Sequence, residues 1–243
     1  YAAIKSGRPI IPVVLLDEVV ETFGAAPKWR LSQSIEHFGV RLKQVGSQLI
    51  LRRGIASNEL LALAKECGAG DIWWTRAYDP DAIARDIKVK SALKGAGFAA
   101  KSWPGHLLFE PWAVKTKQGG LFKVYSPMWR AVKDLDVAPP DPAPLRLMAP
   151  QKWPDSDRLS GWALDRSLDL GAQVLARHAN VGESAAYARL ANFLSGSIGA
   201  YKERRNYPAQ NATSRLSENL AWGEIGPRTV WHAGLRVHHE GHR

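Results

Sequence analysis

Short apolar runs alternate with helical patterns along the first part of the chain. Pro9–Leu16 is an aliphatic run of strand length, which is typical of a strand that is buried on both faces. In Lys28–Gly46 the apolar residues recur at alternating spacings of four and three, which predicts a helix with one apolar stripe. The stripe consists of Leu31, Ile35, Phe38, Leu42 and Val45.

Further strands and helices follow in the same alternation. Strands are predicted at Ser47–Leu51, Asp71–Thr75 and Gly97–Trp103. Ser57 or Asn58 can cap the helix between the first two of these, and a glycine-rich stretch would end it. Asp79-Pro80 can start the next helix, which runs to about Leu93. This order predicts an α/β fold, a doubly wound parallel sheet with helices on both faces.

The pattern changes after a helix predicted at Ser126–Leu135. Six prolines fall between residues 139 and 154, and because proline lacks a backbone donor they predict an extended linker. Every later pattern is helical, at Glu183–Glu203, at Ser214–Trp222 and from Pro227 onwards. We therefore expect an α/β domain at residues 1–135, a linker at 136–180 and the beginning of an all-α domain at 181–243.

The charge balance favours an anionic partner. Among 243 residues there are 33 Lys and Arg against 23 Asp and Glu, a formal net charge of +10. The lone Cys67 excludes a disulfide framework and a zinc site made only of cysteines. The longest apolar run, Ile10–Leu16, is interrupted by Pro12 and is far shorter than the ~20 residues of a membrane span. With no signal segment at the start, we expect a cytoplasmic protein without a membrane partner.

Several familiar signatures are absent from the sequence. It has no G-x-x-x-x-G-K-[ST], no G-x-G-x-x-G after a strand and no G-x-S-x-G. The cluster His238-His239-Glu240-Gly241-His242 lacks the H-E-x-x-H spacing and ends the chain, so we interpret it as a solvated tail and expect no metal. The ten tryptophans are spread along the chain; such rings can stack on bases or pass electrons, but Trp is more often part of a core or an interface.

Two stretches carry the most chemistry. Thr213 or Ser214 would cap the helix that follows, beside Arg215, and the free N–H groups of such a helix end suit a phosphate or a pyrophosphate. Lys202–Arg205 contains three cations, where a phosphate backbone could bind. Judged on the residues alone, a well-capped helix and a solvated helix end explain the same stretches, and both interpretations stay open.

These stretches resemble motifs of the photolyase/cryptochrome family. The 12-residue step from Tyr201 to Thr213 matches the family spacing, and Gly226 stands where serine is usual. The resemblance extends over nearly the whole chain. The residues that carry it are Gly182-Glu183, Tyr201, Arg205, Pro208, Thr213-Ser214-Arg215-Leu216-Ser217, Gly223–Arg228 and Phe122–Pro127.

The resemblance implies a flavoprotein that repairs DNA, a deoxyribodipyrimidine photo-lyase whose partner is damaged DNA. Family members bind FAD in the helical domain and use light to split cyclobutane pyrimidine dimers. By motif position, Tyr201 resembles the residue that contacts an FAD phosphate, and Arg205 resembles a contact to the DNA backbone. The residues that resemble the pyrophosphate-binding segment are Thr213, Ser214, Arg215, Leu216 and Ser217. We expect a monomer.

Part of the family pattern falls outside the chain. Its first strand would lie before Tyr1, and the larger half of its flavin domain, with the catalytic residues, after Arg243, so we expect residues 1–243 alone to be inactive. Gly119-Gly120 stands where folate-binding members have an acidic residue, which leaves a folate antenna, a deazaflavin antenna or none open. Two other functions also remain open: a cryptochrome-type blue-light receptor without repair activity, and a stand-alone nucleotide-binding α/β module.

Overall fold

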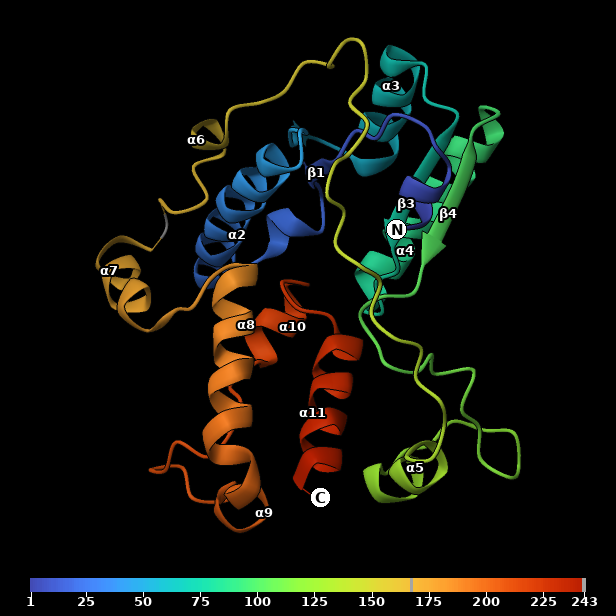
Figure 1. The fold of residues 1–243 in the computed structure, drawn as a ribbon. Coiled ribbons are helices and arrows are strands. Elements are labelled where there is room, and N and C mark those ends of the chain that lie inside the picture. The colour runs from blue at the N-terminus through green and yellow to red at the C-terminus, as the bar shows by residue number, and fades with distance from the viewer. Residues whose placement is uncertain (167, 242–243) are drawn as a thin grey trace.

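The structure, a computed structural model, describes residues 1–166 and 168–241 (Figure 1). Strands and helices alternate in its first part, as the apolar pattern predicts. After the short helix α1 (Ala2–Lys5), the strands are β1 (Val13–Leu16), β2 (Ile50–Arg53), β3 (Asp71–Thr75) and β4 (Ala99–Trp103). The helices between them are α2 (Ala25–Gln44), α3 (Ala56–Cys67) and α4 (Pro80–Gly95), with a 3-10 turn at Val20–Thr22.

The strands pair in parallel, which confirms the predicted α/β class. Val13 of β1 lies opposite Ile50 of β2, and Asp71 of β3 lies opposite Ala99 of β4. Within the described residues the strands form two separate pairs instead of the continuous sheet we expected. The pairs are linked by the Arg85 side chain of α4, which donates to the Asp17 carboxylate after β1 at 2.9 Å.

Some strand and helix ends are determined by residues close to them in sequence. β1 begins at Val13, later than predicted, because Pro12 has no N–H to donate, and its carbonyl accepts from Ile50. Asp79 caps α4 by accepting from the Ala82 N–H at 2.9 Å, as predicted.

The predicted cap of α3 is wrong. This helix begins at Ala56 instead of after Ser57 or Asn58, because the Ala56 N–H donates to the Glu18 carboxylate at 2.9 Å. The acceptor comes from a residue 38 positions away, beyond the reach of any local capping pattern.

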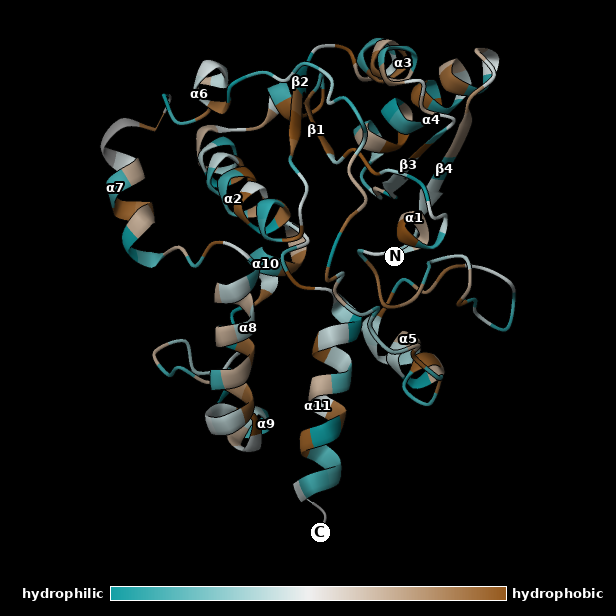
Figure 2. Cartoon of the chain, turned by 45° about the horizontal axis from the view of Figure 1, so that its top comes forward, coloured by the Kyte–Doolittle hydropathy of each residue, from teal (hydrophilic) through white to brown (hydrophobic). Residues whose placement is uncertain are grey.

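Two apolar cores hold the α/β part together. α2 packs on β1 and β2 around Leu16, Ile35 and Leu51, and Figure 2 shows β1 in the brown of hydrophobic residues. α3 and α4 cover β3 and β4 around Val89 and Leu93. The predicted stripe of α2 is only partly right, because Phe38 is 48% exposed.

The second part of the chain is helical. After α5 (Tyr125–Val132) the chain is extended as far as α6 (Leu159–Trp162), and α7 (Asp169–His178) follows. α8 (Glu183–Asn192) continues through a π turn at Phe193–Ser197 and a 3-10 turn at Ile198–Ala200 into α9 (Tyr201–Arg204). The last helices are α10 (Ser217–Ala221) and α11 (Pro227–Gly241). α6 and α7 lie within residues 136–180, the range that we expected to be a linker.

The helices of the second part lie against α2 and beside α5. In Figure 1, α8, α10 and α11 extend away from one end of α2. Trp231 of α11 meets Trp129 of α5 edge to face at 5.9 Å, and the His232 Nε2 atom of α11 lies 2.9 Å from the Val137 carbonyl oxygen. In residues 1–166 and 168–241 we find no helix with the length and apolar character to cross a membrane.

Candidate anion-binding site on the helical part

The segment before α10 runs back along α8 in the opposite direction. At its start, the Ser197 hydroxyl donates to the Asn211 carbonyl at 2.9 Å. Further on, the Arg189 guanidinium of α8 donates to the Arg215 carbonyl at 2.8 Å. Leu216, 2% exposed, then packs on α8 and α11. The segment is therefore fixed at three successive positions along α8 and the π turn that continues it.

This segment presents a row of unused donors. In the described part of the chain, the backbone N–H groups of residues 213–217 donate no hydrogen bond, and neither do the hydroxyls of Thr213, Ser214 and Ser217. Consecutive N–H groups of this kind form a concave site for an anion, and hydroxyls and a guanidinium strengthen it. The arrangement fits a phosphate or pyrophosphate group.

The predicted capping arrangement, however, is wrong. α10 begins at Ser217, its N-cap is Leu216, and no side chain caps it, so Thr213 and Ser214 are not cap residues. The reason is Arg215, whose φ of +50° is a left-handed conformation that a helix cannot contain. The donors of residues 213–216 thus come from an irregular turn, and of the five residues only Ser217 lies in the helix. Because the Leu216 side chain is buried, only its backbone can reach a ligand.

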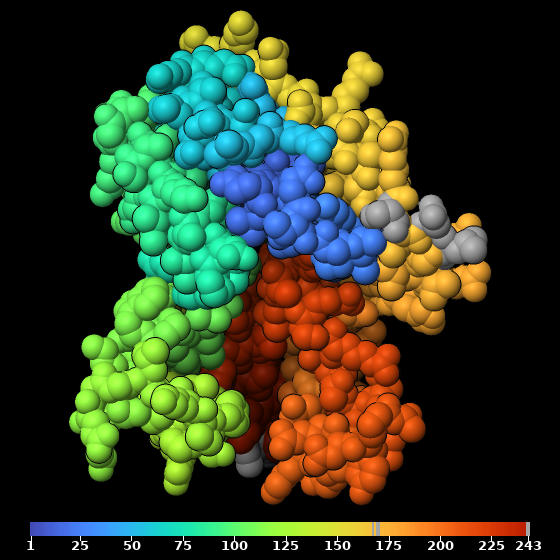
Figure 3. Space-filling view, turned by 180° about the vertical axis from the view of Figure 1, so that it is seen from behind, coloured from blue at the N-terminus to red at the C-terminus, as the bar shows by residue number. Residues whose placement is uncertain are grey.

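Tyr201 and the cations Lys202, Arg204 and Arg205 lie farther along the helical rod, the continuous run of helical turns from α8 through α9 (residues 183–204) and the residue after it. The Tyr201 ring, 38% exposed, meets Phe193 edge to face at 5.8 Å, and the Arg205 guanidinium lies 5.7 Å from its centre. Arg205 and its basic neighbours are exposed. A cavity of about 480 Å³ lies between the π turn and residues 210–212, directly before Thr213, and Arg204 lines it. Figure 3 shows the molecule hollowed beside this region, with α11 recessed in the hollow.

One face of α2 holds this helical part, and the sequence analysis missed it. Arg30, Ser34, His37 and Arg41 are spaced by four, three and four, so they share one side of the helix. Arg41 donates to Glu183 at 3.0 Å. Each of these residues directly precedes a residue of the apolar stripe, so the polar face lies beside the stripe, about 100° around the helix, and this periodicity was the available signal.

Gly182 explains why the second part can approach α2 so closely. Its φ is +93°, and a Cβ there would lie 2.9 Å from the His37 ring. A residue with a side chain would be strained in this conformation and would collide with α2. Glycine therefore allows α8 to start directly on α2.

The centre of this contact is a buried ion pair. The Arg30 guanidinium donates to both carboxylate oxygens of Glu224, at 2.8 and 2.6 Å, and both side chains are 7% exposed. Ser34 donates to the same carboxylate at 3.0 Å, and the Asn219 amide donates to it at 2.7 Å. Burial alone would raise the pKa of Glu224, but hydrogen bonds from Arg30, from the Gly182 backbone and from Asn219 outweigh it and lower this pKa below 4.5.

This lowered pKa predicts a dependence of stability on pH. A carboxyl group with a depressed pKa in the folded state stabilises fully above its unfolded value, and that contribution is lost as the pH falls through the folded value. We therefore expect Glu224→Gln to reduce the loss of stability below about pH 4.5. Urea unfolding of the full-length protein between pH 3 and 7, with about one measurement per pH unit, gives the free energy of unfolding at each pH. Its slope against pH is then compared between wild type and variant. Parallel slopes for wild type and variant would contradict the assignment.

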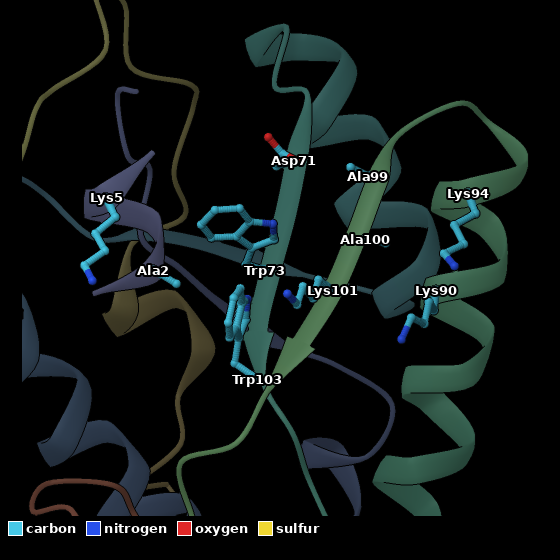
Figure 4. Close-up of a pocket in the computed structure, with 10 residues that line it drawn as sticks. All are labelled: Ala2, Lys5, Asp71, Trp73, Lys90, Lys94, Ala99, Ala100, Lys101 and Trp103. Carbon is cyan, nitrogen blue, oxygen red and sulfur yellow. The ribbon is translucent and has the colours of Figure 1, made fainter. Parts of the chain in front are cut away.

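A second cavity, of about 670 Å³, lies on the uncovered face of β3 and β4 (Figure 4). Trp73 and Trp103 meet there edge to face at 5.8 Å, and the Lys101 ammonium group lies 3.7 Å from the Trp103 ring centre. Figure 4 shows the short helix α1 beside the two rings. Helices normally cover both faces of such a sheet, so we interpret this as a packing face and assign it no ligand.

The histidine cluster at residues 238–242 falls partly outside the described residues. His242 lies outside the described residues, which extend to Gly241. In the ranges that the structure describes, no group of three or more His, Cys, Asp or Glu side chains could hold a metal ion.

Comparisons with known proteins agree with this fold. The DNA photolyase family model matches residues 1–145. A deoxyribodipyrimidine photo-lyase from Agrobacterium fabrum is 39% identical over 98% of this chain and 50% of its own length. Cryptochrome-1 from Arabidopsis thaliana is 29% identical over 95% of this chain and 34% of its own.

A solved structure is similar over the same region. The crystal structure of a bacterial class III photolyase from Agrobacterium tumefaciens superposes with a TM-score of 0.89 at 38% identity, covering 96% of this chain and 48% of that one. The chain thus spans about half the length of the photolyases that it matches. The family model, the identity and the fold agree: the chain belongs to the DNA photolyase family.

Proposed function

We propose that the whole protein is a deoxyribodipyrimidine photo-lyase that binds FAD and splits cyclobutane pyrimidine dimers in DNA by blue light. The observation that carries this proposal is the row of unused donors at residues 213–217, fixed along α8 in a chain of the DNA photolyase family. The family membership supports the reaction class, and the turn would supply donors for the cofactor's two phosphates.

The residues of this chain would bind and orient the cofactor. The N–H groups of residues 213–217 and the hydroxyls of Thr213, Ser214 and Ser217 would donate to phosphate oxygens, and Arg215 would add a positive charge. Tyr201 would contact the same phosphates from the end of the helical rod. When bound, FAD in its reduced and excited form supplies the electron that opens the dimer. An antenna chromophore, of the folate or the deazaflavin type, would belong to the α/β part.

The exposed cations would bind DNA. Arg205 and its basic neighbours lie at the open end of the helical rod, and the sequence carries a formal net charge of +10. Contacts of this kind neutralise phosphates without reading sequence, so they suit an enzyme that must find damage anywhere. A pyrimidine dimer stacks poorly, which lowers the energy required to extrude it from the helix.

We also propose a division of labour along the chain. Residues 1–135 would form the α/β domain, 136–180 would connect the domains, and 181–243 would begin the helical FAD domain. We propose a monomer that acts in the cytoplasm. The alternative function, a blue-light receptor without repair activity, has weaker support, because the cryptochrome match is 29% identical and the photolyase match 39%.

A repair assay tests the proposal. The full-length protein, with FAD reduced, is mixed with an oligonucleotide that contains one cyclobutane dimer and is illuminated with blue light. We expect loss of the dimer only in the light and only with the full-length protein, while residues 1–243 alone stay inactive. Full FAD binding without repair would favour the receptor, and repair by residues 1–243 alone would contradict the division proposed above.

A further inference from the structure

The anion-binding turn is strained and needs external support. Arg215 lies in the left-handed region at φ +50°, which is unfavourable for a residue with a side chain. Such a conformation persists only where neighbouring contacts determine it. The contact at this point is Arg189, whose guanidinium donates to the Arg215 carbonyl at 2.8 Å and also reaches the Asn219 amide oxygen at 3.2 Å.

Asn219 connects this strained turn to the centre of the interface. Its side chain is fully buried, at 0% exposure. Its amide nitrogen donates to the Asn180 carbonyl at 2.9 Å and to Glu224 at 2.7 Å. The Glu224 N–H in turn donates to the Asn219 carbonyl at 2.9 Å. The orientation of Asn219 therefore depends on where the Glu224 carboxylate is held.

Arg30 holds that carboxylate from the α/β part. Its planar guanidinium makes two parallel hydrogen bonds to Glu224, a geometry that fixes direction as well as distance. The chain of contacts thus runs from Arg30 through Glu224 and Asn219 to Arg189 and the Arg215 carbonyl. It joins residues about 190 positions apart in sequence.

Stability alone does not account for this ion pair. Removing two charges from water is costly, so a buried pair is often no more stabilising than apolar residues of the same volume. What a bidentate pair adds is a defined position for the groups it connects.

On the basis of the proposed function, we infer that Arg30 is a positioning residue for the FAD phosphates. It acts through Glu224 and Asn219 and keeps the 213–217 turn in the conformation that presents its donors. Without it, the competent conformation is populated less, and the apparent FAD dissociation constant rises by the same factor.

The test uses Arg30→Met in the full-length protein, with two readouts. First, trypsin cleavage after Arg215 is followed in the FAD-free protein by mass spectrometry, because cleavage reports how often the turn opens. Second, the FAD dissociation constant is measured by flavin fluorescence at a temperature where circular dichroism shows each variant folded. We expect cleavage to accelerate and FAD binding to weaken, each by about tenfold.

Two matched variants separate positioning from a general loss of stability. Arg41→Met removes an exposed ion pair from the same face of α2, and we expect both readouts to stay within about twofold of wild type. Arg30→Lys keeps the charge but loses the bidentate geometry, so its values should lie between wild type and Arg30→Met. If Arg30→Met does not fold, Ser34→Ala, which removes one hydrogen bond to Glu224, should shift both readouts in the same direction by less.

The outcomes are distinguishable. A folded Arg30→Met protein with unchanged cleavage and unchanged FAD affinity would overturn the inference, even if it melted earlier. A wild-type protein that takes up no FAD would overturn the proposed function instead. In that case the cleavage readout alone still decides whether Arg30 orders the turn.

Discussion

Replacing Glu224 by alanine is expected to lower the free energy of unfolding by about 3–5 kcal/mol, a large share of the stability of an ordinary domain. The change removes both hydrogen bonds that the Arg30 guanidinium, 7% exposed, makes to Glu224. Its other carboxylate partner, Glu218, is 3.8 Å away and 36% exposed, so the buried charge loses most of its compensation, which is strongly destabilising. It also removes an acceptor from Asn219, which is fully buried. Urea unfolding of the full-length protein, monitored by circular dichroism, measures the loss.

Two comparisons show whether burial is the cause. The double variant Arg30→Met with Glu224→Met should be clearly more stable than Glu224→Ala, because no charge is left unpaired. Glu183→Ala breaks an ion pair whose side chains are 45% and 39% exposed, so it should cost about 1 kcal/mol or less. Equal losses for Glu183→Ala and Glu224→Ala would contradict the account.

The second large effect is expected from Ser214→Asp in the donor turn. The new carboxylate would face the two phosphates that the turn is proposed to bind. Two like charges about 4 Å apart repel by roughly 1 kcal/mol in water and by about 4 kcal/mol near a protein surface. We therefore expect the FAD dissociation constant to rise by about 100-fold, as measured by flavin fluorescence.

Ser184→Asp is the matched control for this substitution. Ser184 is exposed in the first turn of α8, where an acidic residue interacts favourably with the helix dipole. Its FAD affinity should equal that of wild type. An unchanged affinity in Ser214→Asp would show that the phosphates bind elsewhere.

The sequence predicted the α/β part well where local chemistry decides the structure. β3 occupies the predicted range, Asp79 caps α4, and Gly68 ends α3 in a left-handed conformation. The cap of α3 could not be predicted, because its acceptor, Glu18, is distant in sequence. Phe38 fits a helical stripe by spacing yet is 48% exposed, since periodicity does not say how far a neighbouring element extends.

In the candidate site, too, some features could be predicted from the sequence and others could not. The resemblance to the family motif drew attention to Tyr201 and to Thr213–Ser217, but the residue types suggested a capped helix where Arg215 forms a left-handed turn. The residues that hold the turn escaped notice because each is unremarkable by itself. In the sequence Arg30 is typical of a surface cation on a helix. The fold shows that it forms a buried ion pair with Glu224.

The most direct test of the central claim is a titration of FAD into the full-length protein freed of cofactor. If residues 213–217 hold the cofactor's phosphates, flavin fluorescence should be quenched in a saturable manner at one FAD per chain, and added inorganic pyrophosphate should compete. A protein that takes up no flavin at any concentration would contradict the claim. So would a protein that keeps its bound flavin when pyrophosphate is added.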